Sequence, residues 1–183
     1  SSHAGVEHAR SLGIPVIVTD HHLPGDTLPA AEAIINPNLR DCNFPSKSLA
    51  GVGVAFYLML ALRTFLRDQG WFDERNIAIP NLAELLDLVA LGTVADVVPL
   101  DANNRILTWQ GMSRIRAGKC RPGIKALLEV ANRDPQKLAA SDLGFALGPR
   151  LNAAGRLDDM SVGVALLLCD NIGEARVLAN ELD

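Results

Sequence analysis

The stretch at residues 14–26 constrains the fold most, because a short apolar run ends there abruptly in a carboxylate and two imidazoles. The run Val16–Val18 is β-branched and stands between turn formers, which is typical of a buried strand rather than a helix. We expect a strand over residues 14–19, buried on both faces as in a parallel α/β sheet. Ligands of such sheets gather at the carboxyl ends of the strands.

Three polar side chains follow this strand: Asp20, His21 and His22. Carboxylate and imidazole groups are metal ligands, and packing gives little reason for them at the end of an apolar strand. Pro24 and Gly25 then predict an irregular loop. Two interpretations of the tripeptide remain open: a ligand site, or a cap of the following turn with solvated imidazoles.

A second apolar segment, residues 85–100, holds two acidic residues, Asp87 and Asp96. A carboxylate is almost never fully buried unless it is paired or binds a cation, so Asp96 needs a partner. We expect a helix over residues 82–91 that Gly92 ends, which places Asp96 in a loop or short new element. Asp87 is the weaker candidate, expected in a salt-linked or solvated position on that helix.

A third stretch combines small residues with polar side chains that suit phosphate. We expect a short helix over residues 141–148, capped by a serine, and then a loop that carries Arg150, Asn152 and Arg156. Arginine presents a fork of donors matched to phosphate oxygens. The alternative is that Arg150 or Arg156 pairs with Asp158, Asp159 or a helix C-terminus.

The remaining chain is predicted to be mainly helical. A long helix should begin at Ser48, with Gly51 and Gly53 in its first turn, where they allow either close approach of an anion or tight packing. The other expected elements are helices over residues 1–12, 161–170 and 173–183, a helix capped by Asp101 or Asn103 that runs to about Arg116, a short helix after Gly123 that ends near Ala131, and a short strand over residues 33–36.

Charge and composition limit the possible partners. The net charge of −4 gives no overall attraction to a phosphate backbone, and aromatic residues, at 4%, are too scarce to favour a base-stacking platform. A nucleic-acid channel would therefore need a local basic strip. One basic cluster exists, and it is explained either as a solvated face or as a phosphate contact: Arg114, Arg116, Lys119 and Arg121.

The three cysteines, Cys42, Cys120 and Cys169, are widely spaced and form no zinc pattern. They predict free thiols and a cytoplasmic protein. No apolar run reaches the length of a membrane span, so we expect no membrane contact.

Together, Asp20–His22, Gly92–Asp96 and Gly148–Arg156 resemble motifs of the DHH phosphoesterase superfamily, over essentially the whole chain. Within that family the resemblance is strongest to exonucleases that degrade single-stranded DNA from the 5′ end. Two earlier acidic motifs of the family are expected upstream of Ser1, so the chain is interpreted as an internal piece of a longer protein.

The resemblance implies an α/β fold, with a partial parallel sheet followed by a mostly α-helical region. Residues 1–100 would be the C-terminal part of a DHH domain, and residues 101–183 a helical continuation leading to a linker helix.

It also implies roles for individual residues. His21 and Asp96 would be direct ligands of Mn²⁺ or Mg²⁺ in a two-metal site, while Asp20 would orient an imidazole or contact metal more weakly. His22 would face the substrate phosphate and complete the catalytic set with the other three. The residues expected to grip the DNA backbone are His22, Arg150, Asn152 and Arg156.

The implied activity is phosphodiester hydrolysis of single-stranded DNA by a monomeric repair and recombination enzyme, with a helicase or single-strand-binding protein as candidate partner. The piece alone is expected to be nearly inactive and to bind metal weakly. Two alternatives remain: a DHH phosphodiesterase or pyrophosphatase acting on small substrates, and a degenerate scaffold without catalysis.

Overall fold

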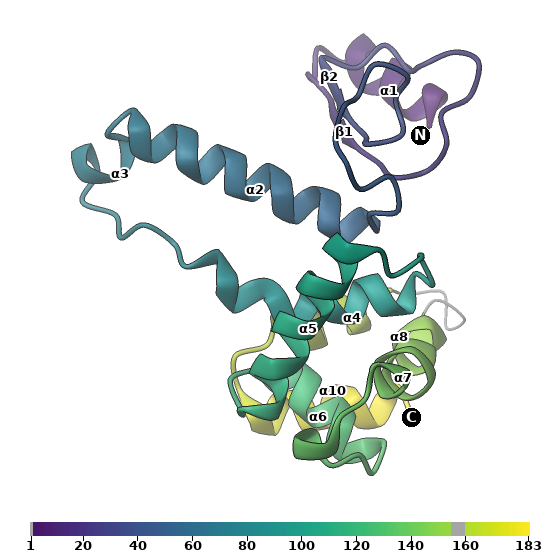
Figure 1. Ribbon diagram of the computed structural model, residues 1–183, viewed down its shortest axis with the longest axis vertical. Coiled ribbons are helices and arrows are strands. Elements are labelled where there is room, and N and C mark those ends of the chain that lie inside the picture. Colours follow the sequence, from purple (N-terminus) through teal and green to yellow (C-terminus); the bar gives the residue numbers. More distant parts are fainter. Residues whose placement is uncertain (1, 155–159) are drawn as a thin grey trace. The chain divides into compact units, whose positions relative to one another are not determined.

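The chain folds into two compact units. The computed structural model describes residues 2–154 and 160–183. The first unit comprises residues 1–80 and 99–104, and the second comprises residues 81–98 and 105–183. A parallel sheet lies in the first unit and helices make up the second, which confirms the expected fold class (Figure 1). The division at residue 100 stays a prediction.

The first unit is built on a sheet of two parallel strands, in which Ile17 is the register partner of Ala33. Ser2 caps the preceding helix, because its Oγ accepts the Gly5 N–H at 3.1 Å. Gly13, at φ 72°, supplies the left-handed turn after it, as expected. The elements of this unit are α1 (His3–Ser11), β1 (Ile17–Thr19), β2 (Ala33–Ile35), α2 (Gly51–Asp68) and α3 (Trp71–Glu74).

The strand predicted over residues 14–19 is shorter and far more exposed than expected. β1 has three residues, and Ile17 is 64% exposed while Val18 is only half-buried. The prediction of a strand buried on both faces is therefore wrong for this chain. The physical reason is that β1 pairs with β2 alone, so no further described strand encloses it.

The start of α2 also differs from expectation. Ala50, not Ser48, is its N-cap, and no side chain caps it. The Ser48 carbonyl instead accepts the side-chain amide of the buried Asn104 at 2.7 Å, which holds Ser48 in the preceding turn. Of the two expected caps of the next long helix, Asp101 rather than Asn103 has this role, because its Oδ1 accepts the Asn104 N–H at 2.9 Å.

The second unit is helical and contains the main hydrophobic core. Ile115, Leu127, Leu147 and Leu166 are fully buried at its centre. Its elements, of which α5 begins in the first unit, are η1 (Leu82–Leu85), α4 (Leu86–Ala95), α5 (Ala102–Arg116), α6 (Pro122–Val130), η2 (Pro135–Lys137), α7 (Ala140–Asp142), η3 (Leu143–Leu147), α8 (Gly148–Ala154), α9 (Ser161–Leu168) and α10 (Ile172–Glu181).

Close helix packing explains Gly111 in α5. A Cβ atom at this position would lie 2.0 Å from the Leu86 carbonyl oxygen, so only glycine lets the backbones of α4 and α5 approach this closely. Gly123 serves the same purpose in α6, where a Cβ would lie 2.1 Å from the Leu166 carbonyl oxygen.

Two expected helix ends do not occur. Helix α4 continues through Gly92 to Ala95, because burial of its apolar side chains outweighs the roughly 1 kcal/mol that glycine costs in a helix. The loop expected after Gly148 is helix α8 instead. It is preceded by the wider π-helical turn η3, which accommodates Pro149, a residue whose ring would crowd the carbonyl in a regular α-helical turn.

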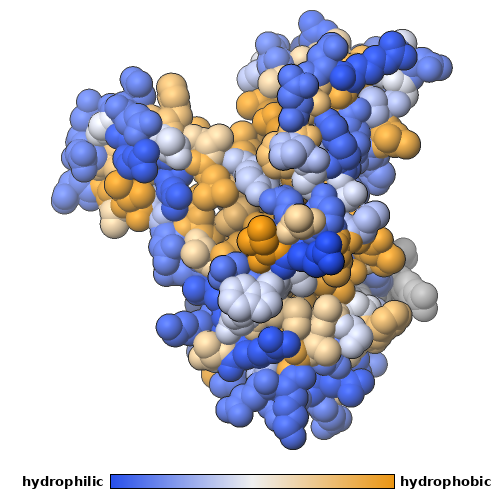
Figure 2. Space-filling view, viewed as in Figure 1, coloured by the Kyte–Doolittle hydropathy of each residue, from blue (hydrophilic) through white to orange (hydrophobic). Residues whose placement is uncertain are grey.

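The surface carries no described membrane-crossing element. No helix among residues 2–154 and 160–183 is both long and apolar enough to span a bilayer. On the face shown in Figure 2, apolar side chains lie in small areas between polar ones.

Candidate functional site

The Asp20 side chain organises the chain at the carboxyl end of β1. The Asp20 backbone N–H donates to the Ile35 carbonyl at 3.0 Å, which continues the strand pairing by one residue. Its Oδ1 atom accepts the backbone N–H of His21 at 2.7 Å and that of His22 at 3.1 Å. The carboxylate therefore holds the two histidines in a tight turn as they leave the sheet.

The same Asp20 oxygen fixes the His22 ring, because Oδ1 lies 2.8 Å from Nδ1. A carboxylate only accepts hydrogen bonds, so this contact assigns the proton to Nδ1 and leaves Nε2 as the outward-facing nitrogen. The His22 side chain is 75% exposed, whereas that of Asp20 is 13% exposed. The pair thus presents one oriented imidazole nitrogen to the solvent.

His21 lies beside its neighbour and beside the start of α2. The His21 and His22 ring centroids are 4.2 Å apart, with the ring planes tilted by 49°. A Cβ atom at Gly51 would lie 3.5 Å from His21 Cδ2, so the imidazole rests against the first residue of the helix. Backbone N–H groups at a helix N-terminus favour anions, which makes this corner suitable for a phosphate beside His21.

Gly53 has a different explanation, since a Cβ there would lie 2.3 Å from Leu49 Cδ2. Tight packing accounts for this glycine. Of the two interpretations of the Gly-x-Gly pair, packing therefore applies at Gly53, whereas a Cβ at Gly51 would make only an ordinary contact with His21.

Two amides from the loop after β2 hold the backbone of the histidines, and sequence reasoning missed Asn36. Its Nδ2 donates to the His22 carbonyl at 2.8 Å, and the residue is only 5% exposed. Asn38 Nδ2 donates to the His21 carbonyl at 2.7 Å, which confirms a structural turn rather than a ligand contact for Asn38. The signal was the Asn-Pro-Asn sequence directly after a strand.

The two acidic candidates of α4 exchange their expected environments. Asp87 is fully buried, and its carboxylate accepts the N–H groups of Leu88 at 2.7 Å and Arg121 at 2.8 Å. The expectation of a salt-linked or solvated Asp87 is wrong. Asp96 is exposed and is the C-cap of α4. Its apolar neighbours in the sequence do not bury it, because α4 ends there and Val97 is 86% exposed.

A meeting of His21 with Asp96 stays a prediction, because they belong to different units, each described by itself. Across residues 2–154 and 160–183, no group of three or more histidine, cysteine or acidic side chains is placed to hold a metal ion. What the first unit does supply is an imidazole pair and an orienting carboxylate. These donor types fit Mn²⁺ and Mg²⁺ sites, in which carboxylate and imidazole ligands combine.

The third predicted group lies on α8 and is partly engaged within the protein. Arg150 donates to Asp183 Oδ1 through Nε at 2.8 Å and to the Ala146 carbonyl at 2.8 Å. Asn152 lies on the same helix and is exposed. Arg156 lies outside the described residues. Arg150 is therefore ion-paired with Asp183, whereas Asp158 and Asp159, the expected partners, lie outside the described residues.

The basic cluster binds backbone carbonyls. Arg116 Nε donates to the Leu138 carbonyl at 3.0 Å, and Arg121 Nε donates to the Leu167 carbonyl at 2.7 Å, at the end of α9. Arginine near a helix C-terminus satisfies free carbonyls and complements the dipole. These two side chains therefore join helices of the second unit, and neither earlier interpretation of the cluster described this.

The family model for the DHH family, N-terminal domain, matches residues 1–93. The chain belongs to the DHH family. Its whole length is 93% identical to the single-stranded-DNA-specific exonuclease RecJ of Salmonella typhimurium and 35% identical to that of Thermus thermophilus. The chain spans 32% and 25% of these relatives, respectively.

Solved structures agree with this assignment. A crystal structure of exonuclease RecJ bound to manganese matches 99% of this chain, and 42% of its own chain, at a TM-score of 0.78 and 36% identity. RecJ of Thermus thermophilus in complex with Mg²⁺ matches 93% of this chain, and 23% of its own, at a TM-score of 0.69 and 36% identity. Both relatives bind divalent cations of the predicted kind.

Proposed function

We propose that this chain forms part of the catalytic core of a metal-dependent 5′→3′ exonuclease that hydrolyses phosphodiester bonds of single-stranded DNA. The observation that carries the proposal is the carboxylate-oriented imidazole of His22 at the end of β1, in a chain 93% identical to a single-strand-specific exonuclease. Each residue role below is part of this proposal.

His21 and Asp96 are the proposed metal ligands. Divalent cations in two-metal phosphoesterase sites activate a water molecule and neutralise charge on the scissile phosphate. Asp20 is a positioning residue, because its Oδ1 already accepts three N–H groups from the histidine pair. Carboxylates that bind the second nitrogen of an imidazole fix its tautomer and orientation.

His22 is proposed to contact the substrate phosphate. Its Nε2 faces outward, and an imidazolium at this position donates a hydrogen bond to a nonbridging oxygen while Asp20 stabilises the positive charge. The first turn of α2, next to His21, adds backbone N–H groups on the same side of the first unit.

Arg150, Asn152 and Arg156 are proposed to hold the DNA backbone. Arg150 is 26% exposed and bound to Asp183, so binding of DNA requires the guanidinium to share this carboxylate or leave it. Exposed ion pairs contribute only about 0–1 kcal/mol, so such an exchange costs little compared with a bidentate phosphate contact.

The cellular setting is also part of the proposal. We infer a monomeric enzyme of DNA repair and recombination, with a helicase or a single-strand-binding protein as partner. The three free cysteines favour the reducing cytoplasm. Because the chain spans about a third of the Salmonella relative, we assign the activity to the longer protein and expect the chain alone to cleave little or no DNA.

The test uses the full-length protein that contains these residues, with 5′-labelled single-stranded DNA and Mn²⁺. His21→Ala and Asp96→Ala should each reduce mononucleotide release by more than about 100-fold, since each removes a proposed metal ligand. Leu12→Ala, at an exposed position of the same unit, is the matched control. Unchanged activity of both variants contradicts the proposal, and a preference for pyrophosphate or cyclic dinucleotides in a substrate panel favours the small-substrate alternative.

A further inference from the structure

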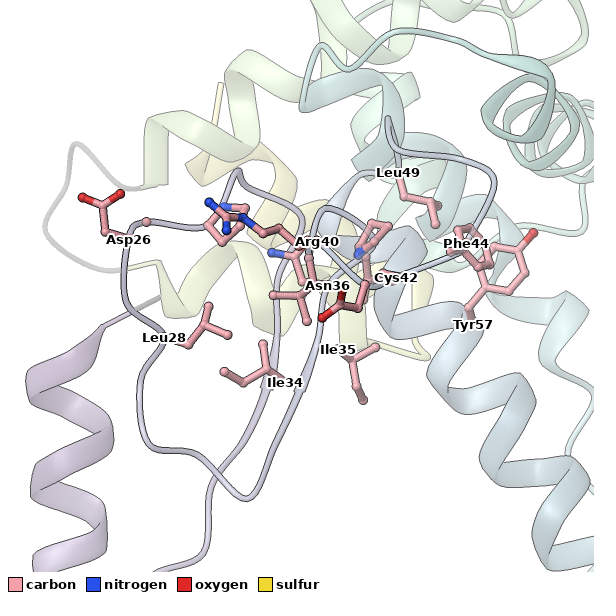
Figure 3. Close-up of a pocket in the computed structure, with 16 residues that line it drawn as sticks. Asp26, Leu28, Ile34, Ile35, Asn36, Arg40, Cys42, Phe44, Leu49 and Tyr57 are labelled. Carbon is pink, nitrogen blue, oxygen red and sulfur yellow. The ribbon is translucent and has the colours of Figure 1, made fainter.

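A cavity of about 800 Å³ lies within the first unit, next to the histidine turn (Figure 3). Binding sites for small molecules typically occupy about 300–1,000 Å³ and combine apolar walls with a few polar groups. The cavity has this character: Leu49 and Val54 are buried beneath it, and Ile34 and Ile35 of β2 form a further wall. None of the residue roles proposed above uses it.

An aromatic pair forms one end of the cavity. The Phe44 and Tyr57 rings lie edge to face, with centroids 5.0 Å apart and an interplanar angle of 70°. The Tyr57 hydroxyl donates to Asn103 Oδ1 at 2.6 Å, and this hydrogen bond fixes the orientation of the Tyr57 ring. Leu28 stands at the opposite end in Figure 3 and is 50% exposed. A planar ligand would thus meet an aromatic edge on one side and an aliphatic side chain on the other.

The charges around the cavity limit what it can hold. Arg40 is exposed, and within the described residues its guanidinium makes no hydrogen bond or ion pair. Asp26 and Asp41 line the same cavity, so the sum of these three charges is −1. A polyphosphate or a run of DNA backbone is disfavoured by this sum, whereas a neutral planar ring with one phosphate near Arg40 is compatible with it.

The cavity is connected to the histidine turn through one shared residue. Asn36 lines the cavity and donates its amide to the His22 carbonyl at 2.8 Å. Pro24, Gly25 and Asp26 also line the cavity, and they follow the histidines after one intervening residue, Leu23. A ligand in the cavity is therefore held by the same loops that position Asp20–His22.

We propose that this cavity binds the base of a single nucleotide unit, with Phe44, Tyr57 and Leu28 contacting the ring and Arg40 its phosphate. The inference rests on the proposed function, because it makes the cavity a nucleotide subsite beside the phosphate-facing histidine. Stacking or edge contacts of aromatic side chains with a base are independent of sequence, which suits an enzyme that takes strands of any sequence.

The experiment titrates the 183-residue chain with thymidine and thymidine 5′-monophosphate, without divalent cations, and follows methyl NMR signals of Leu28, Ile34 and Val54. Both ligands should shift these signals saturably, and the monophosphate should bind more tightly. Leu28→Ala should weaken the binding of both ligands roughly fivefold or more, because it removes apolar contact area for the ring. The Leu28 side chain is half-exposed, so its truncation leaves no cavity in the hydrophobic core. Arg40→Gln should abolish the advantage of the monophosphate.

Leu12→Ala, at the exposed C-cap of α1 and outside the lining of the cavity, should bind like the wild type. Absence of saturable shifts, or equal shifts in Leu28→Ala, overturns the proposal. So does displacement of thymidine only by apolar peptides, which would identify the cavity as a protein contact. A separate Mn²⁺ titration of the His21 and His22 signals tests the proposed metal site, so either proposal can fail without the other.

Discussion

Asp20 Oδ1 lies 2.8 Å from His22 Nδ1 and accepts the backbone N–H groups of both histidines as well. Asp20→Asn removes the negative charge and places either an amide oxygen or an amide NH₂ at this point. We expect His22 to become a mixture of tautomers, because a neutral amide can donate to or accept from Nδ1. Long-range ¹H–¹⁵N NMR spectra of the histidine side chains measure this directly.

The same substitution should lower the affinity of the full-length protein for Mn²⁺ by about 10–100-fold, because Asp20 Oδ1 also accepts the backbone N–H of His21, the proposed ligand, and so positions it. Asp26→Asn is the control, because this exposed carboxylate lies four residues downstream of His22 and lines the cavity. A wild-type tautomer in Asp20→Asn would show that packing alone orients the His22 ring.

Asn36 connects β2 to the histidine turn, and Asn36→Ala should lower the free energy of unfolding of the first unit by about 1–3 kcal/mol. The substitution leaves the His22 carbonyl and the Asn38 N–H without the partners they have at 2.8 Å and 2.9 Å. Urea unfolding followed by Trp71 fluorescence, in a Trp109→Phe background, reports on this unit. Asn43→Ala, at an exposed position, should change the value by less than about 0.5 kcal/mol.

The sequence predicted the order of elements well because local signals fix them. Ser2, Gly13 and Asp101 have capping or turn roles typical of their residue types, and β2 ends at Ile35, one residue before the predicted bound. The two strands are short, but their parallel pairing follows from the helix–strand order that the chain pattern indicated.

Burial could not be predicted in the same way, because it depends on which surfaces meet across the fold. Asp87 and Asp96 occur in equally apolar surroundings, yet only Asp87 is enclosed, through the Arg121 N–H that comes from a segment far along the chain. Gly92 likewise gave a stop signal that tertiary packing overrides. Asn36 was missed because its partner, the His22 carbonyl, is a backbone group with no sequence signal.

Asp87 also acts on a neighbouring thiol. Burial raises the pKa of Cys120 above its ordinary value of 9.0, and the negative charge of Asp87 raises this pKa further. Asp87→Asn removes the second cause, so the Cys120 pKa should fall toward 9.0 while burial keeps it higher. At a fixed alkaline pH the variant should therefore contain more thiolate, and its alkylation by iodoacetamide should be faster.

The free energy of unfolding should depend on pH through the same Cys120 thiol. Because the Cys120 pKa is raised in the folded state, its contribution to stability is present below pH 9.0 and is lost as the pH rises through the folded-state value. This alkaline loss should be smaller in Asp87→Asn, although the variant is less stable overall by about 1–3 kcal/mol because an amide cannot accept both N–H groups. Glu181→Gln, on the exposed surface, should alter neither property.

Val97 adopts a left-handed conformation, φ 58°, directly after Asp96, and its side chain is 86% exposed. A β-branched residue is strained there, whereas glycine is not, and little buried area is lost on substitution. Val97→Gly should therefore raise the free energy of unfolding of the second unit by about 0.5–1 kcal/mol, after allowance for the greater freedom of glycine in the unfolded chain. Urea unfolding followed by Trp109 fluorescence, in a Trp71→Phe background, measures this.

The matched control is Val177→Gly in α10, which is also exposed but helical, and which should lower stability by about 0.5 kcal/mol. The prediction requires that Val97→Gly raises the free energy of unfolding and that Val177→Gly lowers it. Equal destabilisation by the two substitutions would show that Val97 is not left-handed in solution. Mn²⁺ binding by the full-length protein adds a second measurement. If Val97→Gly is more stable but binds Mn²⁺ more weakly, the strained residue contributes to function by fixing the chain direction at Asp96.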